Sequence, residues 1–198
     1  VWIHGRSTQP VKRCITMNSA ATAVIDSHLS DCHLKGQEAH GIGGWAGPGP
    51  YVITNNYIEA SGIGVLIGGA DPTVPGLTPS DITIRGNHFF RPMSWRGVWT
   101  VKNQLEFKHA RRVLVEGNVF ENSWTDAQIG FLVLLTPLAQ DNLAAWTTVQ
   151  DVTFRYNVLR NAPHGLGISS RNAYPFGGRA PLLPSEPAKR ILVAHNLF

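Results

Sequence analysis

The sequence predicts an all-β fold in which short strands stack in parallel as the coils of a solenoid, and three observations predict it. Five asparagines recur in one local pattern, each three residues after an apolar residue and two residues before another: Asn56, Asn87, Asn118, Asn157 and Asn196. A strand-like segment precedes each of the later four asparagines, and a glycine opens a second apolar segment after each of the first four. The asparagines are separated by 31, 31, 39 and 39 residues, and similarity at such periods is typical of repeat proteins.

The strands before the asparagines are predicted from alternation. A polar residue opens each of them, and apolar, often β-branched residues then alternate with other residues over 81–84, 112–115, 151–154 and 190–193. A period of two with β-branched residues is typical of strands, and the polar residue marks the turn before each one. An earlier coil without the asparagine is predicted around residues 24–29.

The second strand of each repeat follows a glycine. Four such segments are predicted as strands: 64–67, 97–101, 130–134 and 165–168. Strands that return in register after a full circuit stack in parallel about 4.8 Å apart, so the sequence predicts a parallel β-helix of about six coils. We expect the asparagines to take the left-handed backbone of a tight corner and to bond to one another as an asparagine ladder.

The loops are predicted where the repeat lengthens. The extra residues fall in 136–146 and 169–189, and the second of these segments is rich in proline. Helices have little support, because the chain holds 20 glycines and 13 prolines and shows no sustained helical period. Loops on one side of a solenoid commonly carry its function.

Composition limits the class of protein. The chain is predicted to be a single domain over residues 1–198, and a fragment of a longer protein, because it stops inside a repeat. Its net charge of +4 is not gathered in a basic run, which argues against nucleic acid as a partner. No apolar run approaches the roughly 20 residues of a membrane span. Cys14 and Cys32 either form one bridge in an oxidising compartment or lie as two buried thiols.

Several strings resemble a known family. Beside the repeated Asn-x-[Phe/Ile/Leu] corner, these are HGIGGW at 40–45, GGADP at 68–72, VEGNVFEN at 115–122 and WTTVQDVTFRYN at 146–157. They resemble the right-handed parallel β-helix superfamily of pectate lyases and other polysaccharide lyases and hydrolases. More closely, the chain is similar to a group of mostly uncharacterised bacterial secreted β-helix proteins. The resemblance covers essentially the whole chain and implies a right-handed coil and an extracellular or periplasmic location, with the signal peptide outside the given sequence.

Lyase chemistry on a uronate directs attention to basic residues beside an acid. A lyase must neutralise the substrate carboxylate, remove the neighbouring carbon-bound proton and protonate the leaving oxygen. Lys102, Glu106 and Lys108 are the first catalytic candidates. If Leu105 and Phe107 face the core, Glu106 and Lys108 both point outward from one strand. The alternative is that these two side chains form an exposed ion pair of little energetic weight.

A second cluster interrupts the repeat near residue 40. Glu38 and His40 offer an acid and a base and complete the catalytic candidates, and Trp45, Lys35 and His109 are the candidates for binding substrate. A departure from local regularity is where a functional site is expected. The alternative is a packed loop in which His40 bonds a backbone carbonyl and Trp45 fills a gap.

Two functions follow from these patterns with nearly equal weight. The first is an extracellular protein active on polysaccharide, which we expect to be a lyase acting on an acidic glycan. The second is a noncatalytic surface protein, adhesin or carbohydrate-binding segment that stacks end to end through its open strand edges. No cofactor is predicted and no metal site is nominated. Calcium is left open, since the acids are scattered along the chain rather than gathered in a compact motif.

Overall fold

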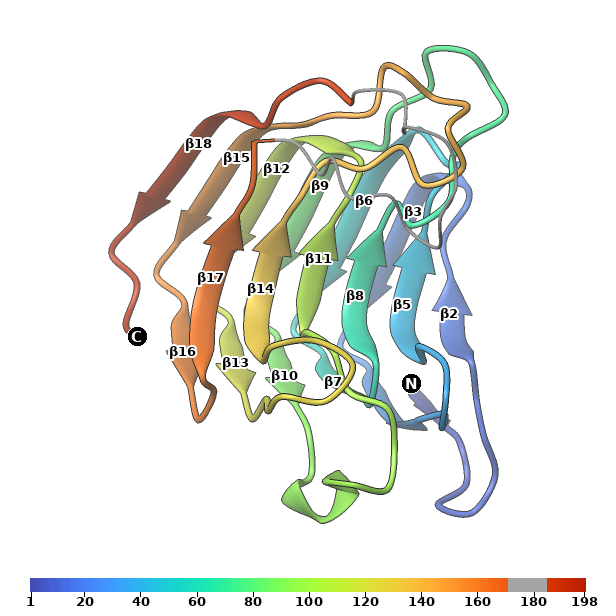
Figure 1. The fold of residues 1–198 in the computed structure, drawn as a ribbon, viewed down its shortest axis with the longest axis vertical. Helices are drawn as coiled ribbons and strands as arrows, with labels where there is room; N and C mark the ends of the chain where they lie inside the picture. The colour runs from blue at the N-terminus through green and yellow to red at the C-terminus, as the bar shows by residue number, and fades with distance from the viewer. Residues whose placement is uncertain (171–184) are drawn as a thin grey trace.

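The computed structural model describes residues 1–170 and 185–198, and its strands form three parallel sheets that wind as a parallel β-helix (Figure 1). Each sheet has six strands, and the chain visits the first, second and third sheet in turn before it returns to the first. Every strand therefore pairs with strands one coil away, and the predicted solenoid of about six coils is confirmed.

Each sheet gathers every third strand of the chain. The first sheet consists of β1 (Trp2–His4), β4 (His28–Cys32), β7 (Tyr57–Ala60), β10 (His88–Phe90), β13 (Val119–Glu121) and β16 (Val158–Arg160). The second consists of β2 (Arg13–Thr16), β5 (His40–Gly44), β8 (Ile63–Ile67), β11 (Leu105–Phe107), β14 (Phe131–Leu135) and β17 (His164–Ile168). The third consists of β3 (Ala20–Ile25), β6 (Gly49–Thr54), β9 (Ser80–Arg85), β12 (Ala110–Glu116), β15 (Val149–Arg155) and β18 (Lys189–Ala194).

The core fills the space inside the coils, because alternate side chains of every strand point inward. On the third sheet, Ile84, Val115 and Phe154 lie one above another in register and are fully buried. On the first sheet, Phe89 stacks on Phe120 with 4.6 Å between ring centroids. Burying one such side chain contributes about 1.5–3 kcal/mol, so the alternation that predicts the strands also supplies their stability.

The asparagine ladder lies at the corner between the third and first sheets. Asn56 Nδ2 donates to Asn87 Oδ1 at 2.9 Å and to the carbonyl of Val24 at 2.9 Å. The same pair of bonds recurs at every rung down to Asn196, which confirms the predicted ladder.

The left-handed backbone of this corner is not where we predicted it. It falls on the residue before each asparagine, with φ between 54° and 66°: Asn55, Gly86, Gly117, Tyr156 and His195. The ladder asparagine must turn its amide inward to reach the next coil, so the tight turn is made one residue earlier.

One predicted strand is wrong. Residues 97–101 form a turn that follows the short 3₁₀ helix η1 (Met93–Trp95), and the strand of this coil is β11, which begins at Leu105. Trp95, Val101 and Trp124 pack together outside the main core. An apolar run that buries itself in a loop has the same composition as a strand, and periodicity alone does not separate the two.

The remaining predictions have mixed outcomes. Residues 136–146 form a loop without strands, as expected. The predicted loop over 169–189 falls mostly on residues 171–184, which lie outside the described residues.

Cys14 and Cys32 are joined by a disulfide with 5.9 Å between their Cα atoms, which decides between the bridge and the two buried thiols. Within the described residues, no helix has the length and apolar character needed to cross a membrane.

Candidate functional site

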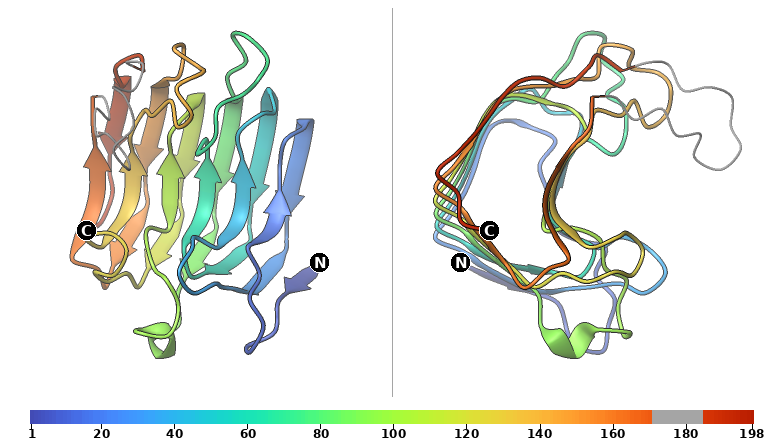
Figure 2. Two further views of the ribbon diagram at one scale, coloured as in Figure 1. Left: turned by 45° about the vertical axis from the view of Figure 1, so that its right-hand side comes forward. Right: turned by 60° about the vertical axis from the view of Figure 1, so that its left-hand side comes forward.

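A pocket of about 580 Å³ lies on the outer face of the second sheet. Its floor is formed by residues of β5, β8 and β11, and loops that project past this sheet on both sides form its walls (Figure 2, right). A volume between about 300 and 1,000 Å³ is usual for a small-molecule site. The pocket collects titratable side chains from three segments of the chain, around β2, β5 and β11: Lys12, Arg13, Glu38, His40, Lys102, Glu106 and Lys108.

Parallel register places the floor residues. Gly43, Leu66 and Glu106 occupy equivalent positions on β5, β8 and β11, so they lie side by side across three coils. Leu105 and Phe107, the chain neighbours of Glu106, are fully buried in the core, which confirms that Glu106 points outward. Gly43 leaves room for the imidazole beside it, because a Cβ there would lie 3.2 Å from His40 Nδ1.

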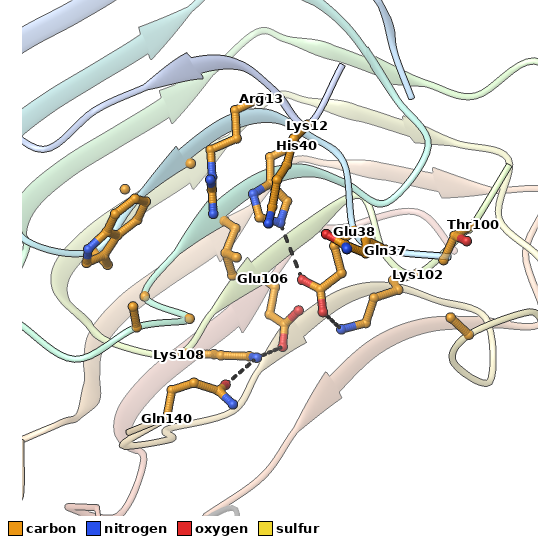
Figure 3. Close-up of a pocket in the computed structure, with 18 of the residues that line it drawn as sticks. Lys12, Arg13, Gln37, Glu38, His40, Thr100, Lys102, Glu106, Lys108 and Gln140 are labelled. Atoms are coloured by element: carbon orange, nitrogen blue, oxygen red, sulfur yellow. Dashed lines mark hydrogen bonds and ion pairs between the residues drawn. The ribbon is translucent and has the colours of Figure 1, made fainter. Parts of the chain in front are cut away.

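Glu38 joins the two predicted clusters. Its Oε1 lies 2.5 Å from Lys102 Nζ and its Oε2 lies 3.3 Å from His40 Nε2 (Figure 3). The sequence separates Glu38 from Lys102 by 64 positions. The loop before β5 and the loop before β11 therefore meet at a single carboxylate.

Glu38 is held ionised. Burial alone raises the pKa of Glu38, but the hydrogen bond with His40, the ion pair with Lys102 and the charge of Lys108 outweigh it and keep the pKa well below its usual range. A carboxylate in this state accepts hydrogen bonds and does not donate a proton near neutral pH. In the tautomer in which the His40 Nε2–H donates a hydrogen bond to Glu38, the lone pair of the imidazole is on Nδ1.

Glu106 and Lys108 form a buried group with two amides. Lys108 Nζ lies 3.8 Å from Glu106 Oε1 and donates to Gln140 Oε1 at 3.1 Å (Figure 3). Asn103 Nδ2 donates to Glu106 Oε2 at 2.9 Å. The side chains of Glu106 and Lys108 are only 3% and 9% exposed. The alternative of an exposed ion pair is therefore wrong, since both groups are largely removed from solvent beneath the pocket.

Lys12 and Arg13 supply positive charge that no carboxylate matches. Neither side chain makes a hydrogen bond or an ion pair with any of the described residues, and Arg13 Nε is buried. The Arg13 guanidinium lies over the Trp45 ring at 5.1 Å, a cation–π contact that holds it on one side of the pocket. Among the residues that the structure describes, four cationic side chains and two carboxylates line the pocket, so two positive charges have no carboxylate to match them there.

Two candidates for binding substrate lie outside the pocket lining. Lys35 Nζ donates to the carbonyl of Gly97 at 3.1 Å and ties two neighbouring loops together. His109 is almost fully buried, with Nε2 against the carbonyl of Leu77 at 3.0 Å and Nδ1 accepting from the Thr148 N–H at 3.2 Å. Burial lowers the pKa of His109, which favours the neutral ring. Trp45, the third candidate for binding substrate, lines the pocket.

Sequence reasoning missed Lys12 and Arg13. They belong to the first coil, which has no ladder asparagine from which its register can be counted. The only signal in the sequence is that both residues lie at the start of a strand-like segment. In the structure this segment is β2, which pairs with β5 and places Arg13 beside His40. Gln37, Gln128 and Gln140 also line the pocket and carry no motif of their own.

Fold and site together define the class of this molecule, a parallel β-helix with a cationic pocket on one sheet. We compared the chain with models of protein families, with curated proteins and with solved structures, and none of the three comparisons found a match. Among the described residues, no three His, Cys, Asp or Glu side chains converge as metal ligands.

Proposed function

We propose that this protein is a secreted, polysaccharide-active β-helix protein whose pocket binds an acidic glycan and cleaves it as a lyase. The observation that carries the proposal is the unmatched Arg13 guanidinium beside Lys12 in a pocket of ligand size. A planar guanidinium binds a carboxylate through two parallel hydrogen bonds, and an anion would satisfy the donors that the described residues leave free. Trp45 adds an aromatic side chain next to that anion position.

The side chains suit elimination better than hydrolysis. Arg13 and Lys12 would neutralise the uronate carboxylate, and His40 Nδ1 would take the proton from the adjacent carbon. The electron pair of that C–H bond forms the new C=C bond, the C–O bond to the leaving sugar breaks, and the Lys108 ammonium protonates the leaving oxygen. A hydrolase needs a carboxylic acid with a raised pKa, whereas the pKa of Glu38 is lowered.

Two further observations support the setting of this proposal. Three parallel sheets in stacked coils agree with the resemblance to the pectate-lyase-like, right-handed β-helix superfamily, and we propose membership of it on that basis. The Cys14–Cys32 disulfide is typical of an oxidising compartment, which supports an extracellular or periplasmic location.

The test uses binding and product formation together. The protein is titrated with oligomers of several uronic acids by calorimetry, and the same mixtures are followed for the ultraviolet absorbance of the unsaturated sugar that elimination creates. We expect Arg13→Gln to weaken binding by roughly tenfold or more, because a charge-assisted pair is lost. Arg112→Gln, which removes an exposed arginine paired with Asp81 on the third sheet, is the matched control and should bind as wild type. Folded protein that binds no uronate oligomer would reject the proposal.

A noncatalytic role is the second candidate, and one observation favours it. Glu38, Lys102, Glu106 and Lys108 are already paired with one another, as they would be in a rigid binding surface. Binding without any unsaturated product across the panel would select this function. End-to-end stacking, which we predicted with it, is tested separately by light scattering over a range of protein concentrations.

A further inference from the structure

Arg91 is an arginine buried without an acid. It follows β10, is 0% exposed, and forms no ion pair among residues 1–170 and 185–198. Burial lowers the pKa of Arg91 to about 9, so the guanidinium still carries its charge near neutral pH. A buried charge without a counter-ion is costly and persists only where many hydrogen bonds compensate it.

The compensation comes from neutral oxygens in three successive coils. Arg91 Nε donates to the carbonyl of Ala60 at 3.2 Å, and Nη2 donates to the carbonyls of Gly62 at 3.3 Å and Asn103 at 3.1 Å. Nη1 donates to the carbonyl of Asn122 at 3.2 Å and to Ser123 Oγ at 3.4 Å. All three guanidinium nitrogens are thus used to fix the corner between the first and second sheets.

This corner contains Lys102, which lines the pocket, and Asn103, whose amide bonds to Glu106 of the pocket lining. The Lys102 N–H donates to the carbonyl of Gly62 at 3.1 Å, and the Lys102 carbonyl accepts from Ser123 Oγ at 3.2 Å. Gly62 and Ser123 are both bonded to Arg91, and so is the carbonyl of Asn103. The guanidinium therefore holds the backbone of Lys102 from both sides.

The side chains of these two residues reach the two carboxylates of the pocket. Lys102 Nζ pairs with Glu38 Oε1, and Asn103 Nδ2 donates to Glu106 Oε2 at 2.9 Å. The loop itself follows the turn at 97–101 and contains no strand before Leu105. Hydrogen bonds to Arg91 and to its partners Gly62 and Ser123 hold the middle of this loop, and the Val101 N–H donates to Asp126 Oδ2 at its start.

We propose that Arg91 is a positioning residue of the pocket, which holds Lys102 and Asn103 and through them orients Glu38 and Glu106. The role of the pocket in glycan binding rests on the function proposed above, whereas the placement of Lys102 does not. Lysine cannot replace arginine here, because one ammonium cannot reach five acceptors arranged around a planar fork.

The first experiment needs no ligand. Wild type and Arg91→Lys are treated briefly with an amine-acylating reagent, and the modification of Lys102 is measured by mass spectrometry relative to that of the exposed Lys12. The Lys102 side chain is 11% exposed and paired with Glu38, so it should react slowly in wild type. We expect its relative rate to rise severalfold in Arg91→Lys and to a smaller extent in Ser123→Ala, which removes one link of the network.

A matched control separates positioning from general loss of stability. Phe154→Leu truncates the core on the third sheet, which takes no part in the corner fixed by Arg91, and urea unfolding is used to compare its stability with that of Arg91→Lys. We expect Phe154→Leu to keep the wild-type rate at Lys102 at temperatures where both variants are folded. An unchanged Lys102 rate in folded Arg91→Lys, or an equal rise in Phe154→Leu, overturns the proposal.

The second experiment measures uronate oligomer affinity in the same variants. We expect roughly a tenfold loss for Arg91→Lys, as for the removal of one or two hydrogen bonds to a charged group, and no loss for Phe154→Leu. If wild type binds no oligomer, the proposed function fails while the acylation result still decides the role of Arg91. If wild type binds and Arg91→Lys binds equally well, the positioning role fails while the proposed function stands.

Discussion

At the scale of single residues, Glu38 determines how the pocket responds to acid. Its pKa lies below the usual carboxyl value, about 4.3, because His40, Lys102 and Lys108 favour the charged form against the effect of burial. A lowered folded-state pKa adds stability above the unfolded pKa, and this stability is lost as the pH falls through the folded value.

Glu38→Gln should therefore remove part of the acid sensitivity of the fold. We expect the free energy of unfolding of wild type to exceed that of the variant at about pH 6, and the difference to shrink as the pH falls below about 4. Urea unfolding at a series of pH values measures both curves. Glu186→Gln, which removes an exposed carboxylate paired with Lys189, is the control. Wild-type and Glu38→Gln curves that stay parallel from about pH 6 to 3 would contradict this assignment.

Only some residues of the candidate site could be predicted from the sequence. Acids and bases lie close together in two short segments, and this predicted five residues of the site: Glu38, His40, Lys102, Glu106 and Lys108. That the two segments meet at Glu38 depends on loop geometry, which local pattern does not encode. Arg91 carries no sequence signal, since four of its five partners are backbone carbonyls that any residue would supply.

At the scale of elements, the asparagine ladder is the feature that the sequence predicted best. Each rung is determined by residues within a few positions of the asparagine, so the local pattern contains the information. The error at residues 97–101 has the opposite cause. Trp99 and Val101 pack against Trp95 and Trp124 in a loop, so the apolar residues of this segment predicted a strand that does not form.

The ladder predicts that the stability lost on removing an asparagine depends on how deeply that asparagine is buried. Asn118→Ala deletes the acceptor of the Asn87 N–H and the donor to the Ile84 carbonyl, which leaves two buried backbone groups without partners. We expect a loss of about 3 kcal/mol in the free energy of unfolding. Asn196→Ala, on the half-buried last rung, should lose less because water can reach the groups it exposes. Equal losses at the two positions, measured by urea unfolding, would argue against a continuous ladder.

At the scale of the whole molecule, stability is divided coil by coil, because each coil contacts only its neighbours. The first coil pairs with a neighbour on one side only in the described residues, and it carries the disulfide between β2 and β4. A bridge that closes a loop of this length contributes about 3 kcal/mol in the loop-entropy account.

Replacing both Cys14 and Cys32 by alanine should therefore loosen one end of the molecule. We expect faster amide hydrogen exchange in β1, β2 and β4, with β12 and β15 unchanged, because the latter lie several coils away. Since Arg13 is the neighbour of Cys14, uronate binding should also weaken. Uniformly faster exchange in all six coils would show instead that the molecule opens as one cooperative unit.

The register of the second sheet has a consequence for how such a molecule changes over time. Arg13 lies beside His40, and Gly43, Leu66 and Glu106 lie side by side on three consecutive strands. Each rung thus contributes one outward position to a common floor while the pairing of its backbone stays the same. Ligand preference can drift through single exchanges on one rung, and neighbouring rungs need no repacking to accommodate them.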